Sequence, residues 1–196
     1  MDQHERVAQK SRTRAALLSV TVNLIDQGRA PTVAEAAKAA AISRATAYRY
    51  FPSQDLLLVE ATLQAATAEV QGLLASPAFP SQVEDRIEVL ASSVYQMLFV
   101  HEAAFRALLR LSADSEASSG PAARGRRRVH WITKALTPLR KQLGTAEFRR
   151  LRAALSMLLG IESLVVLRDI CKLSERESVA VAQWAGRALV RAATRR

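Results

Sequence analysis

Polar side chains gather over residues 43–50, at the start and along the length of a short predicted helix. The guanidinium of Arg44 can donate two parallel hydrogen bonds to the O6 and N7 atoms of a guanine base. Hydroxyl groups such as those of Thr46 and Tyr48 can donate to the oxygens of a phosphate. This chemistry suits a surface that reads and holds nucleic acid, and its first candidate residues are Ser43, Arg44, Thr46, Tyr48, Arg49 and Tyr50.

Two short helices joined by a tight turn would position these groups, which is the helix-turn-helix arrangement. The segment Thr32-Val-Ala-Glu35 forms a capping box, in which the threonine oxygen accepts from an amide and the carboxylate reaches back. Ser43 caps the second helix, and Pro52 ends it because proline disfavours helix in the residue before it. The shared core would comprise Val33, Ala36, Ala37, Ile42, Ala47 and Phe51. Helix pairs of this kind also occur in all-helical proteins that never touch DNA.

Almost the whole chain has helical periodicity, and its 7 glycines and 6 prolines fall at segment ends. The sequence therefore predicts an all-α fold of about nine helices. Short helices precede residue 52 and longer ones follow, so we expect two domains, 1–52 and 53–196. Capping boxes are also expected at 81–84 and 174–177, and Gly28 should end the first helix. The expected helices span about 9–27, 33–39, 44–51, 54–75, 82–100, 102–111, 123–143, 146–170 and 175–193.

The 196 residues carry a net charge of +10, which favours nucleic acid or another anionic surface as a partner. Residues 1–55 hold 8 basic and 5 acidic side chains, whereas residues 121–196 hold 17 and 5. Most of the excess therefore lies outside the predicted helix-turn-helix. A compositional bias toward arginine, as a GC-rich genome would produce, explains this excess as well as a functional basic surface does. The arginine cluster at 124–128 has no assigned role.

The sequence offers little material for a metal site or a membrane segment. One cysteine, Cys171, excludes an internal disulfide and a cysteine-based zinc site, and the 3 histidines are scattered. No run approaches 18 apolar residues, so no membrane span is expected. We predict a cytoplasmic protein without a metal or a cofactor.

A series of motifs from residue 12 to about 60 keeps a specific spacing. It comprises Arg14-Ala-Ala-Leu17-Leu18, Leu24-Ile25-Asp-Gln-Gly28, Thr32-Val-Ala-Glu-Ala36-Ala37, Ala40-Ala41-Ile42-Ser43, Thr46-Ala47-Tyr48-Arg49-Tyr50-Phe51 and Ser53-Gln-Asp-Leu56-Leu57. In these motifs the chain resembles the TetR family of one-component repressors. The remaining 140 or so residues match that family only in length and helicity.

The resemblance implies a bacterial homodimer that binds a pseudo-palindromic operator in double-stranded DNA and is released by a small-molecule effector. Thr32 and Tyr48 would hold phosphates. Arg44, Ala45 and Thr46 would face bases, and Arg49 and Tyr50 would touch the backbone or a base. Two positions depart from the family: Ala41 stands in the turn where glycine is usual, and Gln54 stands where lysine is usual. The phosphate contact at Gln54 would therefore be weaker or neutral.

The last two long helices suit a bundle between two subunits. The helix expected over 146–170 is apolar nearly all round, and the final helix carries small residues that allow close approach. The alternative is that the pair forms a core within one chain. The candidate interface residues are Leu155, Leu159, Val166, Ala182, Trp184, Gly186 and Leu189.

A pocket for a small, largely apolar effector is expected among the middle helices. The candidate residues are Met97, Phe99, His101, Phe105, Leu109, Trp131, Met157 and Ile161. Pocket and core look alike in sequence, so a regulator that acts constitutively or through a protein partner remains an alternative. An enzyme is disfavoured, because the chain lacks a Gly-rich phosphate loop, a Glu-x-x-His pair and a Gly-x-Ser-x-Gly turn.

Overall fold

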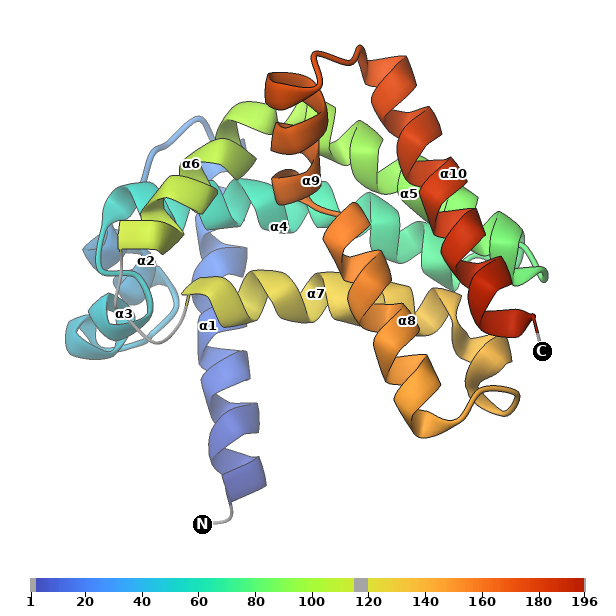
Figure 1. Ribbon diagram of the computed structural model, residues 1–196. Coiled ribbons are helices and arrows are strands. Elements are labelled where there is room, and N and C mark those ends of the chain that lie inside the picture. Colours follow the sequence, from blue (N-terminus) through green and yellow to red (C-terminus); the bar gives the residue numbers. More distant parts are fainter. Residues whose placement is uncertain (1–2, 115–119, 196) are drawn as a thin grey trace. The chain divides into compact units, whose positions relative to one another are not determined.

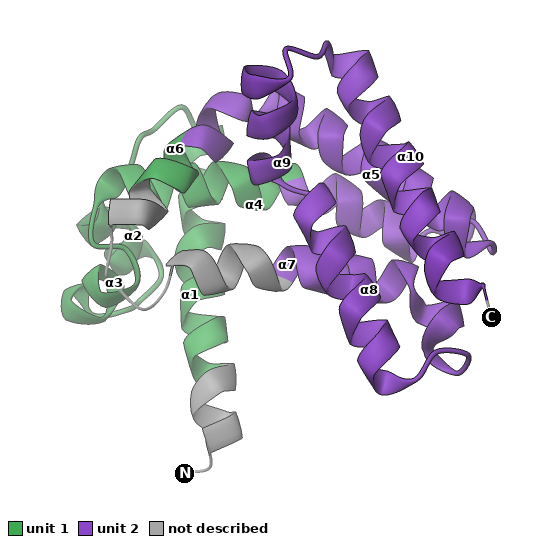
Figure 2. Ribbon diagram, in the orientation of Figure 1, with its two compact units in different colours: residues 1–66, 107–114 green, residues 67–106, 115–196 purple. Residues whose placement is uncertain are grey.

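The computed structural model describes the backbone of residues 3–114 and 120–195 and the side chains of residues 9–110 and 127–195. These residues form ten α-helices, a 3₁₀ turn and a π-helical turn, with no strand among them (Figure 1). The all-α prediction is therefore confirmed. The chain divides into two compact units, Met1–Ala66 with Ala107–Asp114, and Thr67–Arg106 with Ser115–Arg196 (Figure 2). The predicted functional domains, 1–52 and 53–196, stay a prediction.

The first unit contains the predicted helix-turn-helix. Its elements are α1 (Gln3–Asp26), α2 (Val33–Ala39), α3 (Arg44–Tyr50), the first part of α4 (Gln54–Ala75) and the last part of α6 (Glu102–Asp114). One buried apolar cluster holds the first four helices together, formed by Leu17, Leu18, Val33, Ala36, Ala37, Ala47, Phe51, Leu57 and Ala61. Five of the six predicted core residues lie in this cluster, and the sixth, Ile42, packs against it while partly exposed.

α1 ends where Gly28 predicts. This glycine adopts a φ of +76°, which a side chain would disfavour. Its amide donates to the carbonyl of Ile25 at 2.8 Å, and the amide of Arg29 donates to the carbonyl of Leu24 at 3.0 Å. These two bonds make a Schellman motif and satisfy carbonyls that the helix end would leave open.

The second unit is built around α5 and α10. Its other described elements are the end of α4, the start of α6, α7, α8, α9, the 3₁₀ turn η1 and the π-helical turn η2. α10 packs along α5 and also contacts α8, while α7 packs on α5 and α8. Their bounds are α5 Val83–Val100, α7 Gly120–Ala135, η1 Thr137–Arg140, α8 Thr145–Leu158, α9 Ile161–Val165, η2 Val166–Ile170 and α10 Glu175–Thr194.

Two predictions about helix limits in this unit are wrong. The capping box at 81–84 does not form, because α5 begins one residue late: Gln82 occupies the cap position and makes no side-chain bond there. The helix expected over 123–143 ends at Ala135, and Pro138 lies in the 3₁₀ turn that follows. Proline has no N–H to donate and its ring clashes with the preceding turn, so an α-helix cannot run through it unbroken.

The helix predicted over 146–170 is also wrong, because the chain breaks at Gly160. This residue is extended and a Cβ on it would overlap the guanidinium of Arg128. The Nη1 of Arg128 donates to the carbonyl of Ser156 at 3.0 Å, and its Nη2 donates to Glu162 at 2.6 Å. Arg128 from α7 therefore closes the end of α8. Within the 124–128 cluster, the side chains of Arg124 and Arg126 lie outside the described residues.

Candidate nucleic-acid interface

A tight turn sets α3 against α2. The amide of Ile42 donates to the carbonyl of Ala37 at 2.9 Å and that of Ala41 donates to Lys38 at 3.2 Å, which closes α2 in the same way as α1. Ala41 adopts a φ of 54°, in the left-handed region that favours glycine. The missing glycine noticed in the sequence therefore leaves a strained alanine in the turn.

Replacing Ala41 by glycine is expected to stabilise the protein by about 0.5–1 kcal/mol. Removing the Cβ relieves a left-handed conformation that destabilises an L-residue by roughly 1–2 kcal/mol, and the added flexibility of glycine offsets part of this gain. Urea unfolding of the two proteins measures the difference. Ala40→Gly is the matched control: Ala40 has a φ of −85°, so glycine relieves nothing there and should lower stability. Equal effects at the two positions would contradict the strain argument.

Caps at Thr32 and Ser43 begin the two helices. The amide of Glu35 donates to the Oγ1 of Thr32 at 3.2 Å, and the amide of Thr32 donates to the Oε2 of Glu35 at 2.8 Å. The predicted capping box is therefore confirmed. Ser43 accepts the amide of Thr46 at 3.2 Å and donates its hydroxyl to the Thr46 Oγ1 at 2.9 Å. These bonds fix the direction of both helix starts.

The capping bonds hold the pKa of the Glu35 carboxyl below its ordinary value, first through the Thr32 amide and then through the Thr32 hydroxyl. A lowered folded-state pKa means that this stabilisation is complete above the unfolded pKa of about 4.3 and is lost as the pH falls through the folded value. The stability difference between the wild type and Glu35→Gln should therefore shrink between pH 6 and pH 3. Urea unfolding at both pH values measures it, and a constant difference would refute the ionised cap.

α3 presents one exposed face. Ala47 and Phe51 are fully buried and anchor the helix to the core of the first unit. The exposed residues recur at i, i+1, i+4 and i+5, so they lie together on the opposite side. They are Arg44, Ala45, Tyr48 and Arg49, with Tyr48 47% exposed.

Other residues predicted to contact DNA are half-buried or bonded to other residues of the first unit. Thr46 and Tyr50 are half-buried, and the guanidinium of Arg49 lies 5.8 Å from the centroid of the Tyr50 ring. The side-chain amide of Gln54 donates to the carbonyl of Ala30 at 3.1 Å. Gln54 therefore ties the start of α4 to the connection before α2. The role of each of these residues at DNA stays a prediction.

An ion pair that the sequence did not reveal braces the helices under α3. Arg14 on α1 pairs with Glu60 on α4, and Glu60 is only 4% exposed. The guanidinium of Arg14 also lies 5.4 Å from the centroid of the Phe51 ring. Because Phe51 ends α3, this pair connects α1, α4 and α3. The residues next to Arg14 and Glu60 in the sequence give no indication of this ion pair, because the two partners lie on different helices far apart in the chain.

The predicted interface residues of the second unit differ in their burial. Leu155, Leu159, Ala182 and Gly186 are buried within the chain, and a Cβ on Gly186 would lie 2.7 Å from the Cγ2 of Ile87. Leu189 is half-buried. In contrast, Val166 and Trp184 are 46% and 70% exposed. Further large apolar side chains exposed on the same unit from α8 onward are Met157, Ile170 and Val181.

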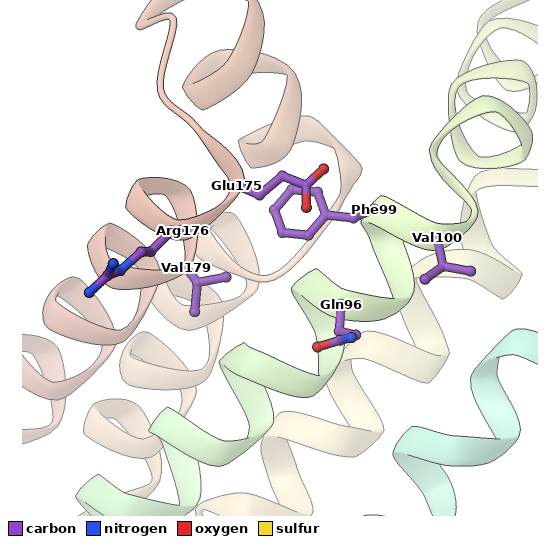
Figure 3. A pocket seen from close by; sticks show the side chains of 6 residues that line it. All are labelled: Gln96, Phe99, Val100, Glu175, Arg176 and Val179. Atoms are coloured by element: carbon purple, nitrogen blue, oxygen red, sulfur yellow. The ribbon is translucent and has the colours of Figure 1, made fainter.

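The predicted pocket residues do not gather in one place. Met97, Phe105, Trp131 and Ile161 are buried, Met157 is 77% exposed and His101 caps the end of α5. Leu109 lies in the first unit. A pocket of about 240 Å³ lies where α5 ends and α10 begins, and Phe99 is the one predicted residue in its lining (Figure 3). Its lining is Gln96, Phe99, Val100, Glu175, Arg176 and Val179.

The described part of the chain contains no candidate metal site and no candidate membrane span. No cluster of three histidine, cysteine or acidic side chains that could hold a metal ion occurs there. No helix in that part is long and apolar enough to cross a membrane.

Comparison with known proteins adds one finding. No family model and no curated protein matches the sequence. A solved structure of a TetR transcriptional regulator from Rhodococcus sp. RHA1 matches with a TM-score of 0.53 and 19% sequence identity. The match covers 92% of this chain and 96% of that chain. The helix-turn-helix unit followed by a helical second unit is thus the fold of a TetR regulator, and that is the fold of this chain.

Proposed function

We propose that the protein is a sequence-specific DNA-binding transcriptional regulator that inserts α3 into the major groove. The exposed face of α3 carries this proposal. Arg44 at the first turn can reach a guanine edge, and the hydroxyl of Tyr48 one turn later can donate to a phosphate. The small side chain of Ala45 lets the backbone approach the bases. A short helix with a buried anchor and a polar outer face has the form that a recognition helix needs.

Selection of bound sequences from a random pool of duplex DNA tests the proposal directly. The purified full-length chain should enrich a pseudo-palindrome whose half-sites are about one helical turn apart or a multiple of it. Arg44→Ala should then weaken binding to the selected site by about 1–3 kcal/mol and relax the preference at one base position per half-site. A repeat of the selection with the variant measures both effects.

Tyr48→Phe provides the contrast to Arg44→Ala. Loss of a phosphate contact should weaken all sequences alike, so the selected site should stay the same. Arg150→Ala on α8, an exposed arginine paired only with its neighbour Glu147, is the matched control and should leave binding unchanged. An unaltered base preference in Arg44→Ala would refute the base-reading role of that residue.

We further propose that the protein acts as a homodimer assembled through α8 and α10. A pseudo-palindromic site requires two recognition helices related by a twofold axis. Exposed apolar side chains on α8, η2 and α10, among them Met157, Ile170 and Trp184, support this assignment. Small buried residues of α10, such as Ala182 and Gly186, would let this helix pack closely on α5 and so hold the exposed side chains in position for the interface.

We propose that the regulator is a repressor released by a small molecule held in the second unit. In such a dimer, one conformation would hold the two α3 helices too far apart or too close for the half-sites. A ligand that binds this conformation more tightly must lower the affinity for DNA, because the two binding equilibria are linked. α4 runs from one unit into the other and would transmit the change. Operator binding that is indifferent to every ligand would favour the constitutive or protein-partnered regulator instead.

A further inference from the structure

Trp131 on α7 carries a buried hydrogen-bond donor without an acceptor. The side chain is only 5% exposed, and its Nε1 has no hydrogen-bond partner among the described residues. Buried polar atoms of native proteins are almost always bonded, because a desolvated donor without a partner destabilises the fold. An unbonded indole N–H inside the second unit therefore points to an acceptor that the described residues do not supply.

Arg127 lies one helical turn before Trp131. Residues at i and i+4 share a helix face, and their Cβ atoms lie roughly 5–6 Å apart. Its guanidinium is largely withdrawn from water, and this burial lowers its pKa. Within the described chain no carboxylate forms an ion pair with it. A desolvated cation without a counter-charge is unfavourable, so this position also calls for a partner of opposite charge.

Two other arginines of this unit, Arg128 and Arg106, have guanidinium groups that are paired with carboxylates. Arg128 pairs with Glu162, and its Nη1 donates to the carbonyl of Ser156 at 3.0 Å. Arg106 binds both oxygens of Asp169 at 2.7 Å. Arg127 differs from both, because no carboxylate among the described residues pairs with it. Arg86 is intermediate: burial also lowers its pKa, its Nη2 donates to the carbonyl of Lys134 at 3.1 Å, and its Nε has no partner among the described residues.

Buried apolar residues follow the two donors on α7 and occur on the helix that α7 packs against. On α7 the residues that follow Trp131 along the buried face, Ile132, Ala135 and Leu136, are all fully buried. α7 packs on α5, where Met97 is 5% exposed. A molecule bonded to Arg127 and Trp131 would therefore meet hydrocarbon beyond its polar head.

We propose that Arg127 and Trp131 hold the oxyanion head of a small amphipathic anion, a carboxylate or a similar group on an apolar body. The guanidinium supplies the counter-charge and a forked donor, which matches a planar oxyanion, and the indole N–H supplies one further donor. A neutral ligand would leave the guanidinium unpaired. This assignment rests on the proposed ligand-responsive regulator and names the chemical class of its effector.

Two fluorescent probes that differ only in charge test the assignment. 1-Anilinonaphthalene-8-sulfonate carries a sulfonate, and N-phenyl-1-naphthylamine is the same skeleton without it. Titration of the full-length protein should give tighter binding of the sulfonate probe. Arg127→Gln should weaken the sulfonate probe at least tenfold and leave the neutral probe within twofold. Trp131→Phe should weaken the sulfonate probe by a smaller factor in the same direction. Arg149→Gln, an exposed arginine on α8, is the matched control and should change neither.

Stability without any ligand gives a second measurement. Because the guanidinium forms no ion pair with the described residues, Arg127→Gln should melt at or above the temperature of the wild type. A clear fall in melting temperature would show that Arg127 has a structural partner and would overturn the proposal. Equal weakening of both probes, or no binding of the sulfonate probe to the wild type at 1 mM, would overturn it as well.

DNA binding separates this inference from the function on which it rests. Without a probe, Arg127→Gln should bind the selected operator as the wild type does, and the sulfonate probe should release only the wild type. A wild-type protein that selects no DNA sequence would contradict the proposed function, whereas the difference between the two probes would still stand for the anion site.

Discussion

Glu60→Gln is expected to lower the free energy of unfolding by about 3 kcal/mol, a large part of the stability of a typical domain. Glu60 is 4% exposed and pairs with Arg14, whose side chain is 17% exposed. The substitution keeps the shape of the side chain but removes its charge, so the largely buried guanidinium of Arg14 loses the full counter-charge of Glu60. Breaking a buried pair at one end destabilises by about 3–5 kcal/mol, and the partial exposure of Arg14 places this pair at the lower limit.

Urea unfolding followed by circular dichroism measures the loss. Glu69→Gln, the same change at an exposed position of the same helix, is the matched control and should alter stability by less than about 0.5 kcal/mol. The double variant Arg14→Met with Glu60→Met should recover much of the loss, because apolar residues of similar size leave no buried charge. A loss in Glu60→Gln no greater than that of the control would show that the pair contributes nothing.

The same pair predicts a loss of DNA binding before global unfolding. Arg14 lies over Phe51, which anchors the end of α3. A loosened contact between Arg14 and Phe51 would allow α3 to move, even where the second unit remains folded.

Trp184→Glu is expected to dissociate the proposed dimer and to abolish operator binding at nanomolar concentrations. Trp184 is 70% exposed on α10, which is unusual for so large an apolar ring unless another surface covers it. Truncation of a tryptophan at the centre of an interface weakens association by about 2 kcal/mol or more, and a charge in its place adds desolvation. The dissociation constant of the dimer should therefore rise about 30-fold or more.

Light scattering across a dilution series measures the dimer, and a shift assay with the selected operator measures the DNA complex. Val100→Glu places the same charge on an apolar residue that is 69% exposed at the end of α5, and it should leave the dimer intact. A Trp184→Glu protein that remains a dimer would exclude α10 as the interface.

The net positive charge is small in the predicted DNA-binding part of the chain and large after residue 120. Residues 1–55 carry a net charge of only +3, so recognition would depend on the placement of a few groups such as Arg44 rather than on bulk charge. Several arginines after residue 120 have internal partners: Arg128 pairs with Glu162, and Arg187 pairs with Glu88. Some of the excess positive charge is therefore neutralised by ion pairs within the second unit. Arg127 is the arginine that we propose to bind the anion.

Much of the local structure could be predicted from the sequence, because its causes lie within one or two helical turns. The capping boxes at Thr32 and Ser174 form as predicted, and Gly28 ends α1 in the left-handed conformation. The exception is the box expected at 81–84. A serine and a glutamate at the right spacing permit a cap, but the first turn of α5 begins one residue later and leaves them unused.

Contacts between distant residues were decided only by the tertiary structure. The spacing of apolar residues indicates which face of a helix is buried, but it does not indicate which other helix covers that face. The break at Gly160 depends on a guanidinium that arrives from α7, and the brace under α3 depends on Glu60 meeting Arg14. For the same reason, the sequence could not separate the buried Gly186 from the exposed Trp184 two residues earlier.

The sequence by itself thus determined the helical fold and the helix-turn-helix, because caps, turns and periodicity are encoded locally. Only the tertiary structure decided which polar groups find partners: Arg128 and Arg106 find theirs within the chain. Arg127 and the Trp131 indole find none among the described residues. The physical reason is that desolvation depends on what surrounds a group in space, and a one-dimensional pattern does not contain that information.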